Sequence, residues 1–395
     1  MEHVKLRYLQ KLCRQRNEDS VDKYVKAMRE VEEKARGCYA EHISLSKDGF
    51  VEMLVIDGCF IIEWIRKYVR REPKDPYDIF FPRSTLLFAI WRDLMLVENQ
   101  LPFFVLTKLF DMTKSEDQNE NIIDAAVRFV TDFQTWEAEK NFYKHVDIGD
   151  LKHLVDLVHK CWCSPFDKII SEKYPIQAET NPKSNFLVDL VHKCWCSPFV
   201  EKLSKKYTIQ AATNPKSNFI RSATELKQAG VKFEKVEETT LFNISFLNGV
   251  MKIPRFSVKD ETEFFARNLV AYEQYLPDGN PTYVTNYFTF IDCLVNSSKD
   301  VEILREADII DSWMGDNETV VTMLNKISND AIISMNRYYM EIFCLVNKYC
   351  NKRVNIWVAN LKQNYFNNPW ALISVLAAAV LLLLAFVQTI FSIIK

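Results

Sequence analysis

Apolar residues recur at helical spacing along most of this chain of 395 residues. Over residues 1–43 they stand three or four positions apart among many charges, which is the pattern of amphipathic helices. Ser46 precedes an apolar stretch and so marks a helix start, while Ser222 and Glu225 have the spacing of a capping box. The pattern predicts a mainly α-helical fold, in which many helices form a globular body.

The segment 84–110 is apolar on most of its faces, which predicts two buried helices. The stretch Asn99 to Pro102 interrupts the pattern, and Pro102 suits the first turn of the second helix because that position needs no amide hydrogen. Further helices are predicted over 119–144 and from 261 to about 361, with breaks near 277–281 and at Gly315.

The segment 240–258 is the only stretch with a convincing β pattern. Two alternating runs flank Asn248-Gly249, a dipeptide that favours a two-residue hairpin turn. Pro254 lies in the second run, and proline cannot donate a ladder hydrogen bond, so we expect this run to be an edge strand. The sequence therefore predicts one small β-hairpin in a helical body.

A tandem repeat occupies the middle of the chain. Residues 154–186 and 187–219 are identical at 26 of 33 positions, and each copy ends in a turn-rich Asn-Pro-Lys-Ser-Asn-Phe stretch. Two copies are too few for a solenoid. We predict four parts: a helical region 1–153, a variable helix-plus-loop duplication 154–219, a hairpin and helical region 220–361, and a C-terminal helix 370–394.

The segment Ala371–Ile394 carries no charge. A helix of this length spans roughly 36 Å, enough for a hydrocarbon core of about 30 Å. Basic residues precede the segment at Lys348, Lys352, Arg353 and Lys362, and only Lys395 follows it. We therefore expect a single C-terminal transmembrane helix that contacts the lipid bilayer, a location at the plasma membrane, and a cytosolic body.

Composition removes several classes of function. The net charge is −2, so no overall field attracts nucleic acid, and we expect no nucleic-acid partner. Eight glycines leave little material for phosphate-binding loops, and ten irregularly spaced cysteines indicate reduced thiols. The glycosylation triplets at Asn243, Asn296 and Asn317 matter only if the body lies outside the cytosol.

The sequence His-Lys-Cys-Trp-Cys occurs in both copies of the repeat. On a helix His159 and Cys163 lie four residues apart on one face, as do His192 and Cys196, and each pair offers two zinc ligands. No paired CxxC spacing completes a ligand set. Reduced thiols on an amphipathic helix are therefore the favoured interpretation, a metal site and a redox switch are the alternatives, and we predict no cofactor.

Three carboxylates stand in apolar surroundings: Asp57, Asp93 and Glu98. Burial raises the pKa of a carboxyl group, which suits general acid–base catalysis, but a buried carboxylate is more often paired with a cation such as Arg66 or Arg92. The chain has no GxSxG, HExxH, Walker or GxGxxG motif. We therefore predict no catalytic residues.

Six segments, in order, resemble a plant family known as domain of unknown function 247, or uncharacterised protein family 0481. They include FVEMLVIDGCFIIE at 50–63, RDLMLVENQLPFFVL at 92–106, SATELKQAGVKF at 222–233, LFNISFLNGVMKIP at 241–254, TEFFARNLVAYEQ at 262–274, and residues 283–301. Members usually begin with a further segment that contains a Gly-Pro-Tyr-His-His-Gly motif. We therefore expect this chain to be truncated at its N-terminus.

The resemblance implies a plant membrane-associated protein of unestablished biochemistry, with no catalytic residues to transfer. Some grass relatives are linked to self-incompatibility as pollen-side recognition determinants. We expect a non-enzymatic module that binds unknown protein partners. The alternatives are a cell–cell recognition determinant with its body outside the cell, and an enzyme of unfamiliar chemistry.

Overall fold

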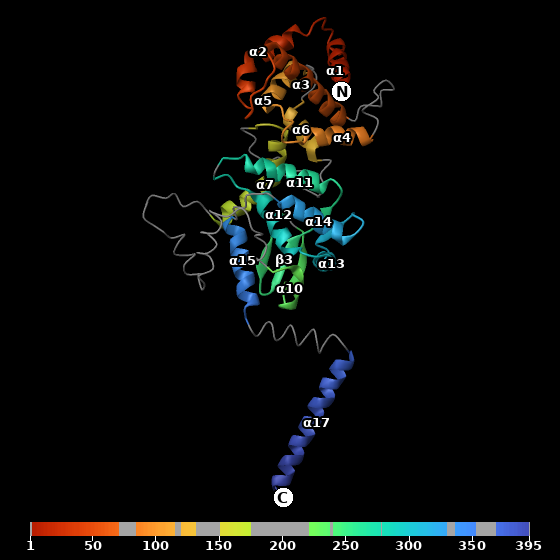
Figure 1. The fold of residues 1–395 in the computed structure, drawn as a ribbon, viewed down its shortest axis with the longest axis vertical. Coiled ribbons are helices and arrows are strands. Elements are labelled where there is room, and N and C mark those ends of the chain that lie inside the picture. Colours follow the sequence, from red (N-terminus) through yellow and green to blue (C-terminus); the bar gives the residue numbers. More distant parts are fainter. Residues whose placement is uncertain are drawn as a thin grey trace, which may run out of the picture. The chain divides into compact units, whose positions relative to one another are not determined.

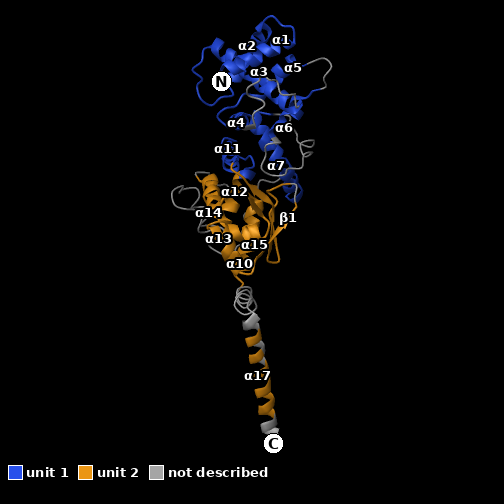
Figure 2. Cartoon of the chain, turned by 90° about the vertical axis from the view of Figure 1, so that its right-hand side faces the viewer, with its two compact units in different colours: residues 1–175, 261–284 blue, residues 176–260, 285–395 orange. Residues whose placement is uncertain are grey.

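The chain is mainly helical in its computed structural model (Figure 1). The structure describes residues 2–70, 84–114, 120–131, 151–174, 221–237, 240–277, 279–329, 336–352 and 369–394. They belong to two compact units: unit 1 contains residues 1–175 and 261–284, and unit 2 contains residues 176–260 and 285–395 (Figure 2). Each unit therefore combines two separate stretches of the chain. The four-part division drawn from the sequence stays a prediction.

Unit 1 is built around helix α3, which packs against α1, α2, α5 and α6. Its buried residues include Trp64, whose ring lies 5.7 Å from the ring of Phe60 and 6.1 Å from that of Tyr8. The helices are α1 Glu2–Gln15, α2 Asp22–Arg36, α3 Lys47–Arg70, α4 Ser84–Leu94, α5 Phe103–Met112, α6 Ile122–Thr131, α7 Leu154–Lys173 and α11 Thr262–Gln274.

Several predicted helix boundaries in unit 1 are confirmed. Ser46 precedes α3, and its hydroxyl accepts a hydrogen bond from the amide of Gly49. The segment 84–110 forms α4 and α5, and Pro102 stands directly before α5. These boundaries could be read from the sequence because a cap or a proline acts within one turn of its own position.

Unit 2 contains two small sheets, whose strands contact α10, α13 and α15. Its elements are α10 Ala223–Gln228, β1 Lys232–Val236, β2 Ser245–Leu247, β3 Val250–Pro254, β4 Phe256–Val258, α13 Ser298–Glu306, β5 Ile310–Ser312, α14 Asn317–Ser328, α15 Arg337–Cys350 and α17 Pro369–Ile394, with α12 Tyr283–Leu294 starting in unit 1. The predicted capping box is present on α10: Ser222 and Glu225 exchange hydrogen bonds with each other's backbone amides.

The predicted hairpin is confirmed, but it belongs to a larger sheet. Strands β2 and β3 pair in antiparallel fashion around Asn248 and Gly249, whose φ values are both positive, as this tight turn requires. However, β1 pairs with the other side of β3, so the order is β1-β3-β2. The expectation that Pro254 marks an edge strand is wrong, because β3 is central and Pro254 is its last residue.

A second sheet was not expected from the sequence. Strands β4 and β5 pair in parallel, with Phe256 opposite Ile310. Each strand has three residues, too few to show a period of two, and their pairing joins segments more than 50 residues apart. Fold class is thus mainly α with two small sheets rather than one hairpin.

The expected transmembrane helix is wrong for this structure. A membrane span needs about 20 consecutive apolar residues in one helix. Among the helices of the described ranges, none combines the length and the apolarity needed to cross a membrane. The single-pass location at the plasma membrane, which rested on this helix, is corrected with it.

Replacing Gly249 with alanine is expected to destabilise unit 2. The backbone at Gly249 has φ +83°, and a Cβ there would lie 2.5 Å from the ring of Tyr349 on α15. The left-handed conformation alone costs about 1–2 kcal/mol for a residue with a Cβ. A lower midpoint of urea unfolding measures the effect. Alanine at Gly315, where a Cβ would meet nothing within 4 Å, is the matched control.

Candidate functional site

Helix α7 forms the helical part of the first repeat copy, residues 154–186, and its N-terminal half is buried in unit 1. Its N-terminal half contributes the core residues Leu154, Leu157 and Val158, and the helix contacts α6 and α11. His153 is the N-cap, and its Nδ1 accepts a hydrogen bond from the amide of Asp156 at 3.2 Å. This capping fixes where the helix starts and therefore which residues face α11.

Three polar side chains meet between α7 and α11. His159 Nε2 lies 2.9 Å from Glu273 Oε1 and 3.4 Å from Cys163 Sγ, and all three residues are buried. Oε1 of Glu273 also accepts a hydrogen bond from the amide of Val284 at 3.0 Å. The ligand atoms of the three residues lie within 4.8 Å of one another. We call these three residues the His-Cys-Glu cluster.

A second polar contact lies one helical turn from the cluster. The hydroxyl of Tyr272 donates to Asp156 Oδ1 at 2.7 Å, and the other carboxylate oxygen accepts from the amide of Lys152. Burial and this hydrogen bond both raise the pKa of Tyr272. The Tyr272 ring also packs edge-on against His159, at 5.3 Å between centroids. These contacts hold the imidazole of His159 in one orientation.

The thiols of α7 are kept protonated by their surroundings. Burial raises the pKa of Cys163 well above its ordinary value, and the charges of Glu273 and Asp167 raise it further. Burial also raises the pKa of Cys161 to about 12. A thiol in this state is a poor nucleophile, since the thiolate is the reactive form. The arrangement therefore does not favour nucleophilic catalysis or a redox switch at these cysteines.

Comparisons with known proteins identify the family of this chain. A family model described as "plant protein of unknown function", DUF247, matches residues 1–384. The chain belongs to the DUF247 family. It is 28% identical over 382 residues to the UPF0481 protein At3g47200 of Arabidopsis thaliana, covering 92% of this chain and 72% of that protein. It is 22% identical over 443 residues to the putative UPF0481 protein At3g02645 of the same plant, covering 98% and 82%. No solved structure matches.

The sequence predicted only part of the cluster in this DUF247 chain. His159 and Cys163 lie on one face of α7, as their spacing indicated. Glu273 was missed, because no local pattern connects it to a histidine 114 residues earlier. Glu273 lies in the segment 262–274, which resembles the family, but the resemblance implied no role for its carboxylate. His192 and Cys196 lie outside the described residues, so their part in a metal site stays a prediction.

The three carboxylates singled out as candidate acids lie in different surroundings. Asp57 is half-buried and pairs with Lys5 Nζ at 2.6 Å, while burial raises the pKa of its carboxyl group. Asp93 and Glu98 are exposed, which contradicts the expected apolar setting. Their apolar neighbours in sequence, Trp91 and Leu101, are buried, but Asp93 lies in the last turn of α4 and Glu98 in the turn that follows this helix. The structure therefore does not assemble them into one site.

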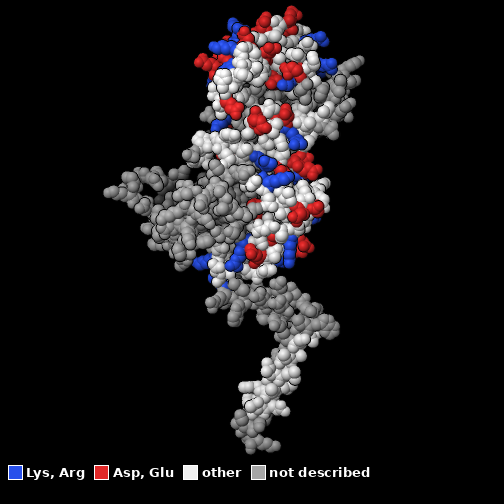
Figure 3. Space-filling view, in the orientation of Figure 1, with Lys and Arg blue, Asp and Glu red and all other residues white. Residues whose placement is uncertain are grey.

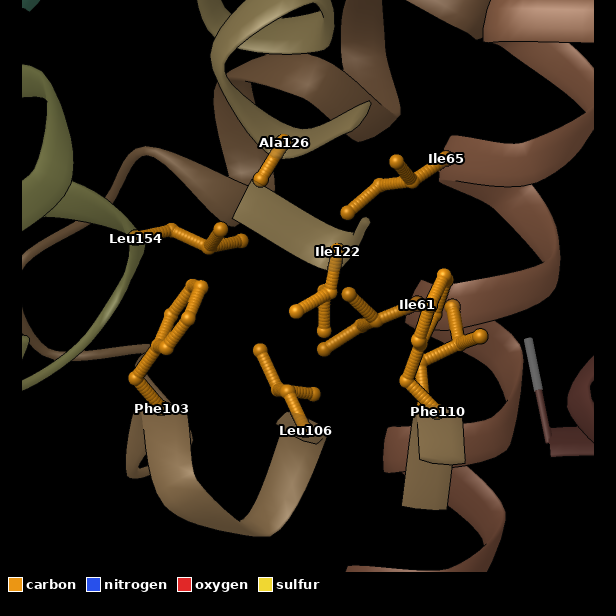
Figure 4. A pocket seen from close by; sticks show the side chains of 9 residues that line it. Ile61, Ile65, Phe103, Leu106, Phe110, Ile122, Ala126 and Leu154 are labelled. Atoms are coloured by element: carbon orange, nitrogen blue, oxygen red, sulfur yellow. The ribbon is translucent and has the colours of Figure 1, made fainter. Parts of the chain in front are cut away.

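An apolar gap in the core of unit 1 has no polar group with which to bind a substrate. Its walls come from α3, α5, α6 and α7, and it has no room for a water-sized molecule. Figure 4 shows the side chains converging on one another. They are Ile61, Ile62, Ile65, Phe103, Leu106, Phe110, Ile122, Ala126 and Leu154. A ligand pocket needs more space and a few polar groups, so this gap is part of the packed core.

The surface of the DUF247 chain carries both signs of charge. On the face drawn in Figure 3, acidic and basic side chains are interspersed over the described part. Pairs such as Lys235 with Asp308 at 2.7 Å and Arg255 with Asp311 at 2.9 Å neutralise each other in unit 2. This mixed pattern differs from the basic stripe of a nucleic-acid-binding protein. The absence of a nucleic-acid partner stays a prediction.

Proposed function

We propose that this chain is a non-enzymatic module that binds another protein through unit 2. The observation that carries the proposal is Trp313, whose side chain is 74% exposed although it is one of the largest apolar side chains. Tryptophan is enriched among the residues that dominate binding energy at protein interfaces. An aromatic ring left in water is therefore a candidate anchor for a partner.

The backbone under Trp313 is fixed by the second sheet. Its amide donates to the carbonyl of Val258 at 2.9 Å, directly after the paired strands β4 and β5. The amide of Met314 donates to the hydroxyl of Ser312. A binding residue on a rigid element loses little conformational entropy when a partner covers it. Lys259 Nζ, 5.8 Å from the ring centroid, adds a positive charge beside the apolar surface.

Alanine at Trp313 is expected to weaken partner binding about 30-fold or more, since truncating a hot-spot tryptophan typically costs about 2 kcal/mol or more. The measurement is proximity labelling in plant cells, which compares the neighbours of W313A with those of the unmodified chain. Tyr275 is 76% exposed in unit 1, so Tyr275→Ala is the matched control. Neighbours that stay the same in W313A but change in the control would contradict the proposal.

A second candidate is a recognition determinant displayed outside the cell, and the accessibility of Asn296 favours it. Among the acceptor triplets, Asn296 is exposed, whereas the carboxamides of Asn243 and Asn317 accept hydrogen bonds from Tyr338 and Arg305. This function predicts a mass decrease on glycosidase treatment of the plant protein, lost in N296Q. An unglycosylated Asn296 in protein isolated from plant cells would exclude it.

A further inference from the structure

We propose that the His-Cys-Glu cluster of unit 1 binds a thiophilic divalent transition metal, with Zn²⁺ as the ion that fits its ligand set best. The ligand atoms are Nε2 of His159, Sγ of Cys163 and a carboxylate oxygen of Glu273. Imidazole, thiolate and carboxylate are the three kinds of zinc ligand in proteins, and a thiolate disfavours Mg²⁺ and Ca²⁺. The site would tie α7 to the end of α11.

The first argument is that three groups able to bind a metal converge on one buried point. Nε2 of His159 lies 2.9 Å from Glu273 Oε1 and 3.4 Å from Cys163 Sγ. A neutral imidazole has one hydrogen, so when Nε2 donates it to the carboxylate the same nitrogen cannot also accept a hydrogen from the thiol. A cation placed among the three atoms satisfies all of them at once.

The second argument is distance. Bonds from zinc are about 2.0–2.1 Å to nitrogen, 2.3 Å to sulfur and 2.0–2.2 Å to oxygen, so ligand atoms of a tetrahedral site stand roughly 3.3–3.6 Å apart. In this structure the nitrogen lies 2.9 Å from the oxygen and 3.4 Å from the sulfur, and all three atoms lie within 4.8 Å. Small side-chain movements are enough to admit the ion.

The third argument is that the ligands are already held. His159 and Cys163 are one helical turn apart on α7, and the Tyr272 ring packs against the imidazole. The amide of Val284 fixes the Glu273 carboxylate through a hydrogen bond to Oε1. Outer contacts of this kind orient metal ligands and tune their affinity. Three protein ligands leave one position of the shell for the second carboxylate oxygen or a water.

Metal binding is coupled to the loss of one proton. The hydrogen of the neutral imidazole moves from Nε2 to Nδ1, which leaves the Nε2 lone pair free for the ion, and the thiol of Cys163 releases its proton to solvent. Because the thiol must lose its proton before it can bind the ion, affinity falls as the pH is lowered. Without a cation, this thiol stays protonated in the folded chain.

The test is titration of the full-length, metal-free chain with Co²⁺, which reports a thiolate ligand through a sulfur-to-metal charge-transfer absorption, followed by displacement with Zn²⁺. We expect one equivalent per chain at the His-Cys-Glu cluster, with a Zn²⁺-induced rise in the midpoint of thermal unfolding. Cys163→Ser should abolish the charge-transfer band, and Glu273→Gln should weaken binding about 10–100-fold. The E273Q variant preserves side-chain size, so it reads out binding even if C163S folds poorly.

Two control variants remove the same kinds of side chain at positions outside the cluster. Cys161→Ser removes another buried thiol of α7, and the double variant His192→Ala with Cys196→Ser removes the pair in the second copy of the repeat. Both should keep the band. Failure of the unmodified chain to bind Co²⁺ or Zn²⁺, binding that survives in C163S, or loss of the band in the second-copy variant would overturn the proposal.

Discussion

Replacing Glu273 with alanine is expected to lower the free energy of unfolding of unit 1 by about 3–5 kcal/mol. Oε1 of Glu273 accepts hydrogen bonds from His159 Nε2 and from the amide of Val284, and the side chain is fully buried. Removing it leaves two buried donors without that acceptor, at about 1–3 kcal/mol each, and adds a small cavity. Urea unfolding of the metal-free chain measures the change, so the result does not depend on metal binding.

Two variants make this prediction specific. Glu273→Gln keeps a carbonyl oxygen that can accept the Val284 amide, so its loss of stability should be about half that of E273A. Glu52 is an exposed residue in the second turn of α3, and its alanine variant should change the unfolding free energy by less than about 0.5 kcal/mol. An E273A protein as stable as E52A would show that the cluster contributes nothing to the fold.

Acidification is expected to destabilise the chain through His153. Burial lowers the pKa of this histidine from 6.5 to about 4. Between these values the unfolded chain binds a proton that the folded chain does not, so stability falls as the pH is lowered through this window. Protonation would also remove the lone pair on Nδ1 that caps α7. The loss between pH 7.5 and pH 5 should be about 2 kcal/mol, at about 1.4 kcal/mol per pKa unit.

Asparagine is the informative replacement at position 153. It caps helices well and does not titrate, so His153→Asn should keep most of the stability at pH 7.5 and flatten the loss on acidification. Urea unfolding at several pH values, compared between the two proteins, isolates this histidine from other titrating groups. Equal slopes of stability against pH in both proteins would show that His153 is not the source.

Features whose cause is local were predictable. The hairpin turn follows from Asn248-Gly249, because both positions need positive φ, and the box on α10 follows from Ser222 and Glu225. The burial of the candidate acids was not predictable in the same way. Asp93 stands within an apolar run, yet its position on α4 leaves it exposed and bonded to Asn99. Neighbours in sequence do not decide which face of a helix is covered.

The sheets and the cluster required the tertiary structure. Strand β1 has charged residues at Lys232, Glu234 and Lys235, which are common on edge strands but leave no alternation of apolar and polar residues to recognise. Its partner β3 begins 14 residues after β1 ends. Likewise, the carboxylate that completes the His-Cys-Glu cluster comes from another helix. Both pairings depend on how distant segments pack together, and the sequence of one segment alone does not indicate its partner.

The sequence by itself determined the family, the helical character, the boundaries set by caps and prolines, and the shared face of His159 and Cys163. Only the tertiary structure decided that Glu273 joins them, that β3 is a central strand, and that Trp313 is left in water. The physical reason is range. Caps, turns and helical periodicity act over a few residues, whereas burial and polar contacts between helices depend on residues more than a hundred positions apart.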